Sequence, residues 1–380
     1  MPNFSGIWNL KEQVQAIAAG RWTGLPTGEL YAWGDGVSGK LGDGTTVDKS
    51  SPVQIGVLTN WARISAGGSH TASIKTDGTL WTWGSNLNGR LGDGTEVNQS
   101  SPIQIGALTS WLQVDAGGTH NAAVKTDNTL WTWGANGQGQ LGDGTTVNKS
   151  SPVQIGALTN WVQASAGDDF CAAIKTDGTL WTWGDNPSGP LGDGTTVDKS
   201  SPVQVGALTN WAQIGAGDFH AVATTTSGEL YAWGSNTNGK LGDGTTLSRS
   251  SPVQIGALTT WVGVSGGASH SAAVKTDGTL WIWGSGLNGR LGDNTVVSKS
   301  SPVQIGALTT WSKISVGGTC STAIKTDGTL WVWGPNGQGQ LGDGTIDNKS
   351  SPVQIGALTT WAQASVGENH TVAILQGTTN

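Results

Sequence analysis

The sequence predicts an all-β fold built from seven copies of one unit, and three observations support this prediction. The string Leu-Gly-Asp-Gly-Thr begins at Leu41 and returns every 50 residues, with Asn294 replacing its second Gly in one copy. All but Trp8 and Trp22 of the 21 Trp fall into three registers of the same period. The 61 Gly divide each unit into apolar segments that are too short for helices, which indicates strands joined by tight turns.

Within one unit, the order of these segments predicts four strands. Residues 70–76 and 79–84 are expected to form a hairpin, because the Asp77-Gly78 pair between them favours a two-residue turn. A Pro at the start of a strand is tolerated, since its missing N–H lies outside the hydrogen-bond ladder. In the rest of the unit we expect a Gly-rich connection at 85–101, a strand that begins with Pro at 102–105, and a final strand at 111–116.

The ends of the chain indicate how the units assemble. A unit of this size cannot bury both faces alone, so the units must stack, either as an open solenoid or as a closed propeller. The first unit lacks an alternating strand at 20–26, and residues 370–375 supply an extra copy of it after the last unit. We therefore expect a seven-bladed β-propeller whose C-terminal strand pairs with residues 29–34 and closes the ring.

Residues 1–28 precede the repeats and are expected to form an anchor segment, which leaves 29–380 as the propeller domain. Asn9 followed three residues later by Glu12 favours a helix start. So short a helix must dock on something, either on its own propeller or on another protein. We predict an anchor for another protein, made by Trp8 and an apolar stripe of Leu10, Val14 and Ile17.

Composition excludes several classes of protein. Charged residues make up only 12% of the chain and the net charge is −7, which argues against nucleic-acid binding through clustered Lys and Arg. The start of the chain lacks a secretory signal, and apolar runs are too short for membrane insertion. Cys171 and Cys320 have neither metal-ligand spacing nor a disulfide framework, so free thiols are expected.

Two repeated polar registers could carry chemistry, but a structural role is favoured for both. The five His occupy one register, and Phe170 and Cys320 in its other two copies favour packing or hydrogen bonding over a ring of metal ligands. The Asp of each Leu-Gly-Asp string is expected to cap its own turn rather than to bind calcium. Near-equal copies leave no unique acid–base pair, so we expect neither an enzyme nor a cofactor or metal site.

One turn departs from the repeat. The residues before the His register are small and neutral in most copies, but two neighbouring units carry acidic and aromatic residues there. Drift in a solvated turn is the alternative to a binding site. We predict a partner-binding patch at one end of the ring, formed by Asp168, Asp169, Phe170, Asp218 and Phe219.

The motifs Gly-x-x-His-x-x-Ala-Ile, Asp-Gly-x-Leu-Trp-x-Trp-Gly and Asn-x-x-Gly-x-Leu-Gly resemble the regulator of chromosome condensation repeat, over residues 29–375. The resemblance implies a seven-bladed propeller but no single function, since its members include exchange factors for small GTPases and an inhibitor protein of β-lactamases. The opening Gly6-Ile7-Trp8-Asn9-Leu10 resembles the start of some structural proteins of marine tailed phages.

The favoured hypothesis is a non-enzymatic binding or structural propeller, and most specifically a phage virion appendage or decoration protein that binds other virion proteins. The alternative is a soluble, cytoplasmic module of inhibitor or lectin type that binds a protein or a surface glycan. Guanine nucleotide exchange is less favoured, because the constant 50-residue spacing leaves no room for an inserted wedge.

Overall fold

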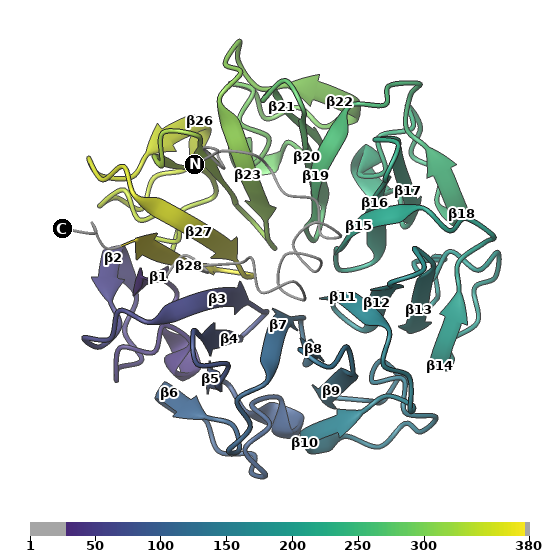
Figure 1. The fold of residues 1–380 in the computed structure, drawn as a ribbon. Helices are drawn as coiled ribbons and strands as arrows, with labels where there is room; N and C mark the ends of the chain where they lie inside the picture. Colours follow the sequence, from purple (N-terminus) through teal and green to yellow (C-terminus); the bar gives the residue numbers. More distant parts are fainter. Residues whose placement is uncertain (1–27, 377–380) are drawn as a thin grey trace, which may run out of the picture.

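The computed structural model describes residues 28–376, which form an all-β propeller whose sheets surround a central axis (Figure 1). The segment of Trp8, Leu10, Val14 and Ile17 lies outside the described residues. None of the helices among residues 28–376 is long and apolar enough to cross a membrane. The helices are single 3₁₀ turns, namely η1 (Val37–Gly39), η2 (Leu87–Gly89), η3 (Thr237–Gly239) and η4 (Leu287–Gly289).

The strands occupy four positions between the axis and the rim (Figure 1). The innermost strands are β3 (Trp61–Ala66), β7 (Trp111–Ala116), β11 (Trp161–Ala166), β15 (Trp211–Ala216), β19 (Trp261–Gly266), β23 (Trp311–Val316) and β27 (Trp361–Val366). The second strands are β4 (His70–Lys75), β8 (His120–Lys125), β12 (Phe170–Lys175), β16 (His220–Thr225), β20 (His270–Lys275), β24 (Ser321–Lys325) and β28 (His370–Gln376). The third strands are β5 (Leu80–Gly84), β9 (Leu130–Gly134), β13 (Leu180–Gly184), β17 (Leu230–Gly234), β21 (Leu280–Gly284), β25 (Leu330–Gly334) and β1 (Gly28–Gly34). The outermost strands are β6 (Gln99–Gln104), β10 (Lys149–Gln154), β14 (Lys199–Gln204), β18 (Arg249–Gln254), β22 (Lys299–Gln304), β26 (Lys349–Gln354) and β2 (Lys49–Gln54).

Five sheets have four antiparallel strands, and one sheet has eight. The larger sheet runs β27-β28-β1-β3-β4-β5-β6, with β2 paired to β1. Within it, β1 and β28 pair along their whole length, from Gly28↔Gln376 to Gly34↔His370. In contrast, β1 and β3 share the single pair Gly28↔Trp61.

The predicted hairpin is present, with β4 and β5 on either side of the Asp77-Gly78 turn. Gly78 has a φ of 76°, and Asn128 adopts a φ of 61° at the same place in the next repeat. Asn is one of the few residues other than Gly that tolerate this conformation.

The outermost strand begins earlier than the sequence pattern predicted. We expected it to start at Pro102, whereas β6 starts at Gln99. The pairing with β5 shifts register between Gly84↔Gln99 and Thr82↔Ile103. Because β6 is the last strand of its sheet, a Pro inside it removes no ladder bond to a further strand.

The core lies between neighbouring sheets and is organised by Trp. Trp61 and Trp83 are almost fully buried and pack edge to face, with ring centroids 6.0 Å apart. The Leu-Gly-Asp-Gly-Thr string of one repeat packs against the next sheet. Gly92 lies so close to the Trp133 indole of that sheet that a Cβ added to Gly92 would be 2.8 Å from the ring. Most of the Trp excess therefore serves packing, as the sequence predicted.

Candidate interaction site at the channel mouth

The innermost strands enclose a central channel with a cavity of about 480 Å³. Polar side chains link neighbouring strands around its wall. The Ser65 hydroxyl accepts a hydrogen bond from the Ala116 N–H at 3.0 Å and donates one to Asp115 at 2.8 Å. Asp115 in turn accepts bonds from Ser165 and from the Ala166 N–H, and its burial raises the pKa of its carboxyl group.

A ring of Gly narrows one end of this channel, between the innermost and second strands. At each of these positions a Cβ would lie between 2.2 and 2.5 Å from the carbonyl oxygen of the equivalent Gly in the next repeat. No side chain other than hydrogen fits at such a distance. The ring consists of Gly67, Gly117, Gly167, Gly217, Gly267, Gly317 and Gly367.

The residues after these Gly form the acidic mouth, which we define as Asp168, Asp218 and Glu368 with the adjacent Asp169 and Phe219. The three carboxylates after the Gly all line the channel cavity. Burial and the negative charges of Asp169, Asp218 and Glu368 raise the pKa of Asp168 to about 7. Burial, with Glu368 and Asp169 adding to it, raises the pKa of Asp218 to about 6 even though the Lys240 charge opposes the shift. These carboxylates therefore repel one another at one end of the channel.

Side chains at the edge of the mouth hold it in place. Asp169 accepts hydrogen bonds from the Thr119 hydroxyl and the Gln140 amide, both at 3.0 Å. Phe219 is 38% exposed, and the Lys240 ammonium lies 6.0 Å from its ring centroid. Asp168, Asp169 and Asp218 thus lie close enough to act on one another, and Phe219 follows Asp218 directly in the chain. Partner binding by these residues stays a prediction.

Phe170 must be removed from the predicted patch. It is the first residue of β12, is 1% exposed, and packs in a core cluster with Trp211 and Trp233. Phe170 occupies the His register, whose side chains point between neighbouring sheets. The turn ends at Asp169, so Phe170 already belongs to the buried strand. Adjacency to Asp169 in sequence does not place its ring on the surface.

Sequence reasoning missed Glu368 and two basic residues at the mouth: Arg90, which lines the same cavity and whose charge acts on Asp168, and Lys240, whose charge acts on Asp218. Arg90 donates to the Gly118 carbonyl at 3.2 Å and Lys240 to the Ala268 carbonyl at 3.1 Å. Glu368 shares the register of Asp168 and Asp218, so alignment of all copies could have found it. Glu368 lies far from Asp168 and Asp218 in sequence, and only the curvature of the ring brings it close to them.

The His register has the structural role that was favoured. His70 Nε2 lies 2.9 Å from the Asn121 Oδ1 of the next repeat, and His270 Nε2 lies 2.9 Å from Ser321 Oγ. Burial, helped by nearby Arg charges, lowers the pKa of each of these two imidazoles to about 3, so both are neutral. Within residues 28–376, no three His, Cys, Asp or Glu side chains are grouped to hold a metal ion.

The two Cys are buried free thiols, as expected. Burial raises the pKa of Cys320 to about 12 and that of Cys171 well above its ordinary value. Both groups are therefore protonated and unreactive at neutral pH.

The Asp of the Leu-Gly-Asp string caps its turn, as predicted. Asp43 Oδ1 accepts hydrogen bonds from the Thr45 N–H at 2.9 Å and from the Thr45 hydroxyl at 2.8 Å. A salt bridge of 3.3 Å to Lys49 completes the arrangement. Partial burial by itself would raise the pKa of Asp43, but these bonds together with the Lys49 charge outweigh it and lower that pKa.

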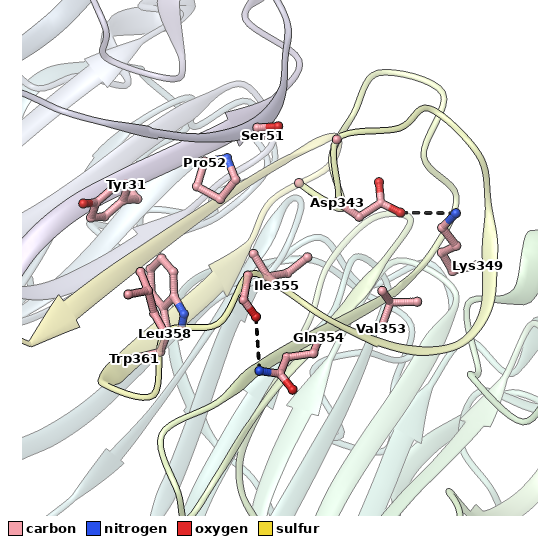
Figure 2. A pocket seen from close by; sticks show the side chains of 13 residues that line it. Tyr31, Ser51, Pro52, Asp343, Lys349, Val353, Gln354, Ile355, Leu358 and Trp361 are labelled. Atoms are coloured by element: carbon pink, nitrogen blue, oxygen red, sulfur yellow. Dashed lines mark hydrogen bonds and ion pairs between the residues drawn. The ribbon is translucent and has the colours of Figure 1, made fainter.

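A second cavity, of about 630 Å³, lies on the rim between the last repeat and the first (Figure 2). Tyr31 and Trp361 line one part of it, and Asp343 forms a 3.2 Å salt bridge to Lys349 in another. The same ion pair recurs at 3.2 Å between Asp143 and Lys149. This ion pair is therefore a feature of the repeat, whereas the set of carboxylates at the acidic mouth occurs once among the described residues.

A ring of Trp-packed sheets, with one acidic end of its channel, defines an all-β propeller scaffold. The repeats that build it are those of the RCC1-like domain, whose family model matches residues 29–373, and the chain belongs to that family.

Solved structures share the fold at low sequence identity. Human WBSCR16 is 21% identical with a TM-score of 0.84, covering 92% of this chain and 99% of its own. Yeast RCC1 (Prp20) bound to Kap60 is 18% identical with a TM-score of 0.83, covering 100% of this chain and 94% of its own. Prp20p from Saccharomyces cerevisiae, in a second structure, is 20% identical with a TM-score of 0.80, covering 94% of this chain and 93% of its own. At such identities the likeness establishes the fold alone.

Proposed function

We propose that this protein is a non-enzymatic binding module that engages a basic segment of a protein partner at the acidic mouth. The observation that carries the proposal is the convergence of Asp168, Asp218 and Glu368 on one end of the channel. Their mutual repulsion is relieved when a cationic group binds between them. The yeast relative is described as bound to Kap60 and as binding Gsp1p and histones, so protein partners are compatible with this scaffold.

Titration with a lysine-rich peptide, followed by calorimetry, tests this proposal. We expect Asp168→Asn, Asp218→Asn and Glu368→Gln together to weaken binding by at least about tenfold, since removing interfacial charge pairs typically costs more than 1.4 kcal/mol. Affinity should rise from pH 5.5 to pH 8, because Asp168 and Asp218 have pKa values of about 7 and 6 and bind a cation only when ionised.

A matched control removes the same formal charge from the rim through Asp48→Asn, Asp198→Asn and Asp347→Asn. Asp48 and Asp198 each accept a hydrogen bond from a backbone N–H, and Asn98 accepts the equivalent bond in another repeat, so Asn is compatible with this position. Asp347 is exposed and lies one residue before this register. Equal loss of affinity in the two triple variants would show that net charge rather than the mouth binds the peptide.

We infer further that the ring has seven blades and that β28 closes it. The eight-stranded sheet divides at the single β1–β3 pair into β27-β28-β1-β2 and β3-β4-β5-β6. Contacts between the ends of the chain support the inference: the Ala66 N–H donates to Ser365 Oγ at 3.0 Å, and a Cβ on Gly367 would lie 2.3 Å from the Gly67 oxygen. The last repeat thus contacts the first as every other repeat contacts its neighbour.

The virion role, a virion location and the domain division at residue 28 stay predictions, and so does surface-glycan binding. The N-terminal anchor proposed for the virion role consists of Trp8, Leu10, Val14 and Ile17, which lie outside the described part of the chain. Nucleotide exchange remains the competing function. Accelerated release of a labelled guanine nucleotide from a small GTPase by the purified protein would replace the proposal of a non-enzymatic module.

A further inference from the structure

The fifth residue of each innermost strand lines the channel and links one repeat to the next. Where this residue is Ser, its hydroxyl accepts a hydrogen bond of 3.0 to 3.2 Å from the backbone N–H of the sixth strand residue in the following repeat. A neutral hydroxyl is therefore sufficient for this part of the wall. The position holds Ser65, Ser165, Ser265, Ser315 and Ser365 in five repeats, Gly215 in a sixth and Asp115 in β7.

Asp115 makes the same wall bond and adds a negative charge. Its Oδ2 accepts a hydrogen bond from the Ala166 N–H at 2.9 Å, as the Ser hydroxyls do in their repeats. Burial raises the pKa of its carboxyl group, which means that the ionised form is disfavoured by its surroundings. None of the ion pairs within residues 28–376 involves Asp115. The wall thus contains a carboxylate that its hydrogen bonding does not require and that no ion pair of the described chain neutralises.

The cavity that contains Asp115 is continuous with the acidic mouth. Asp115, Ser65 and Ser165 line the same space of about 480 Å³ as the three mouth carboxylates. Asp115 precedes the mouth register by three residues, which corresponds to about 10 Å along an extended strand. The ring of Gly lies between these two levels and places no side chain across the passage. A slender chain that enters at the mouth therefore has a path to Asp115.

Three hydrogen-bond acceptors remain at this level. A carboxylate offers about four lone-pair positions, and Asp115 uses three of them for the Ser65 and Ser165 hydroxyls and the Ala166 N–H. Each of the two Ser oxygens has two lone pairs and accepts one backbone N–H. One position on Asp115 and one on each Ser match the three donors of a primary ammonium. A guanidinium needs two free positions on the carboxylate for its bidentate pairing.

We propose that Asp115, Ser65 and Ser165 bind the primary ammonium of a Lys side chain that a partner inserts into the channel from the acidic mouth. This inference rests on the function proposed above and names the side chain that the channel recognises. The mouth attracts the basic segment, and Asp115 receives the tip of the Lys that reaches it. The long, unbranched stem of Lys occupies the passage that the Gly ring leaves open.

Calorimetric titration of the full chain with two peptides of equal charge tests the proposal. One is a lysine-rich peptide, and the other carries 2,4-diaminobutyric acid at each Lys position, so that every side chain is two methylenes shorter. Both present the same charges to the mouth, but only the Lys side chain reaches Asp115. At neutral pH we expect the wild-type chain to bind the Lys peptide at least about tenfold more tightly, as a hydrogen bond between two charged groups provides.

Asp115→Ser is the matched variant, because Ser occupies this position in five other repeats. It should abolish the preference for the Lys peptide and leave binding of the shorter peptide unchanged. Its midpoint in urea denaturation should equal or exceed that of the wild type, whereas a purely structural role for Asp115 would lower it. Asp115→Asn removes the charge at equal size and should also abolish the preference, even if Asp115→Ser does not fold.

The outcomes separate this inference from the function on which it rests. A preference for the Lys peptide that persists in folded Asp115→Ser would overturn the role of Asp115 and leave the mouth as the binding site. The triple variant Asp168→Asn, Asp218→Asn and Glu368→Gln should weaken both peptides alike. Failure of the wild type to bind either peptide would overturn the proposed function together with this inference. Binding of n-butylammonium as tight as that of the Lys peptide would identify a free amine as the ligand and overturn insertion of a partner's side chain.

Discussion

Residues at the same position of different repeats have different structural roles, because each contacts a different neighbour. His270 and Phe170 occupy the same place in their repeats, yet one donates or accepts a hydrogen bond to the next repeat and the other fills apolar space. Likewise, the Lys75 ammonium lies over two Trp rings, whereas Thr225 at the same register donates its hydroxyl hydrogen bond to Glu229. The physical environment, not the repeat position, sets the role of a side chain.

At the residue scale, His270→Phe should reduce the acid sensitivity of the fold. The imidazole has a pKa of about 3 when folded and about 6.5 when unfolded, so the unfolded chain binds a proton that the folded chain does not. The free energy of unfolding therefore falls as pH drops below 6.5. The difference between pH 7.5 and pH 5.0, measured by urea denaturation, should shrink by about 2 kcal/mol in the variant. An unchanged difference would mean that His270 is not buried as a neutral ring.

The elements are held to one another by close approaches that only Gly permits. The turns between innermost and second strands place Gly317 beside Gly367, and the Leu-Gly-Asp strings place Gly92 against Trp133. Because these Gly carry no side chain, the innermost strands of neighbouring repeats can approach one another closely around the axis. Convergence in turn brings the side chains of the acidic mouth within reach of one another.

At the element scale, Gly317→Ala should destabilise the protein by about 2–3 kcal/mol, as overpacking does. The added methyl would lie 2.2 Å from the Gly367 oxygen, and the backbone of two elements would have to move. Gly137→Ala is the matched control, because nothing lies within 4 Å of its Cβ position and its φ is ordinary. Urea denaturation followed by Trp fluorescence should separate the two variants, and similar midpoints would contradict the close contact.

At the scale of the whole molecule, the arrangement of charge distinguishes the two ends of the channel. Net charge is −7, but most carboxylates cap turns or pair with Lys on the rim. Asp168, Asp218 and Glu368 instead meet on the axis, where the ring concentrates residues that are 50 to 200 positions apart. This acidic end therefore breaks the repetition of the scaffold, and it is the place where we propose that a partner binds.

Ring closure can be tested by a disulfide between the two ends of the chain. Glu29 and Leu375 are directly paired, so Glu29→Cys with Leu375→Cys should form an intramolecular bond on mild oxidation. Glu229→Cys with Leu375→Cys is the control, since Glu229 has the same register in a distant repeat. Peptide mapping by mass spectrometry should find the bond in the first variant alone; its absence there would contradict closure by β28.

Local pattern was enough to predict the strands, the hairpin turns and the buried Trp. Each of these depends on residues a few positions apart, and the repeat reports the same local preferences several times over. The start of β6 was predicted three residues late because a bulge, which depends on pairing with β5, precedes Pro102. Phe170 was wrongly assigned to the surface because its direction is set by the turn before β12.

The sequence by itself determined the 50-residue unit, its all-β character and the side chains that pack between units, because periodicity and turn chemistry are local properties. The tertiary structure decided which distant turns face one another, and so brought Glu368 to Asp168 and Asp218. It also revealed that the Lys75 ammonium lies over two Trp rings and that Asp115 shares one cavity with the mouth. Those relations depend on the curvature of the whole ring and on contacts across strands, which no local pattern encodes.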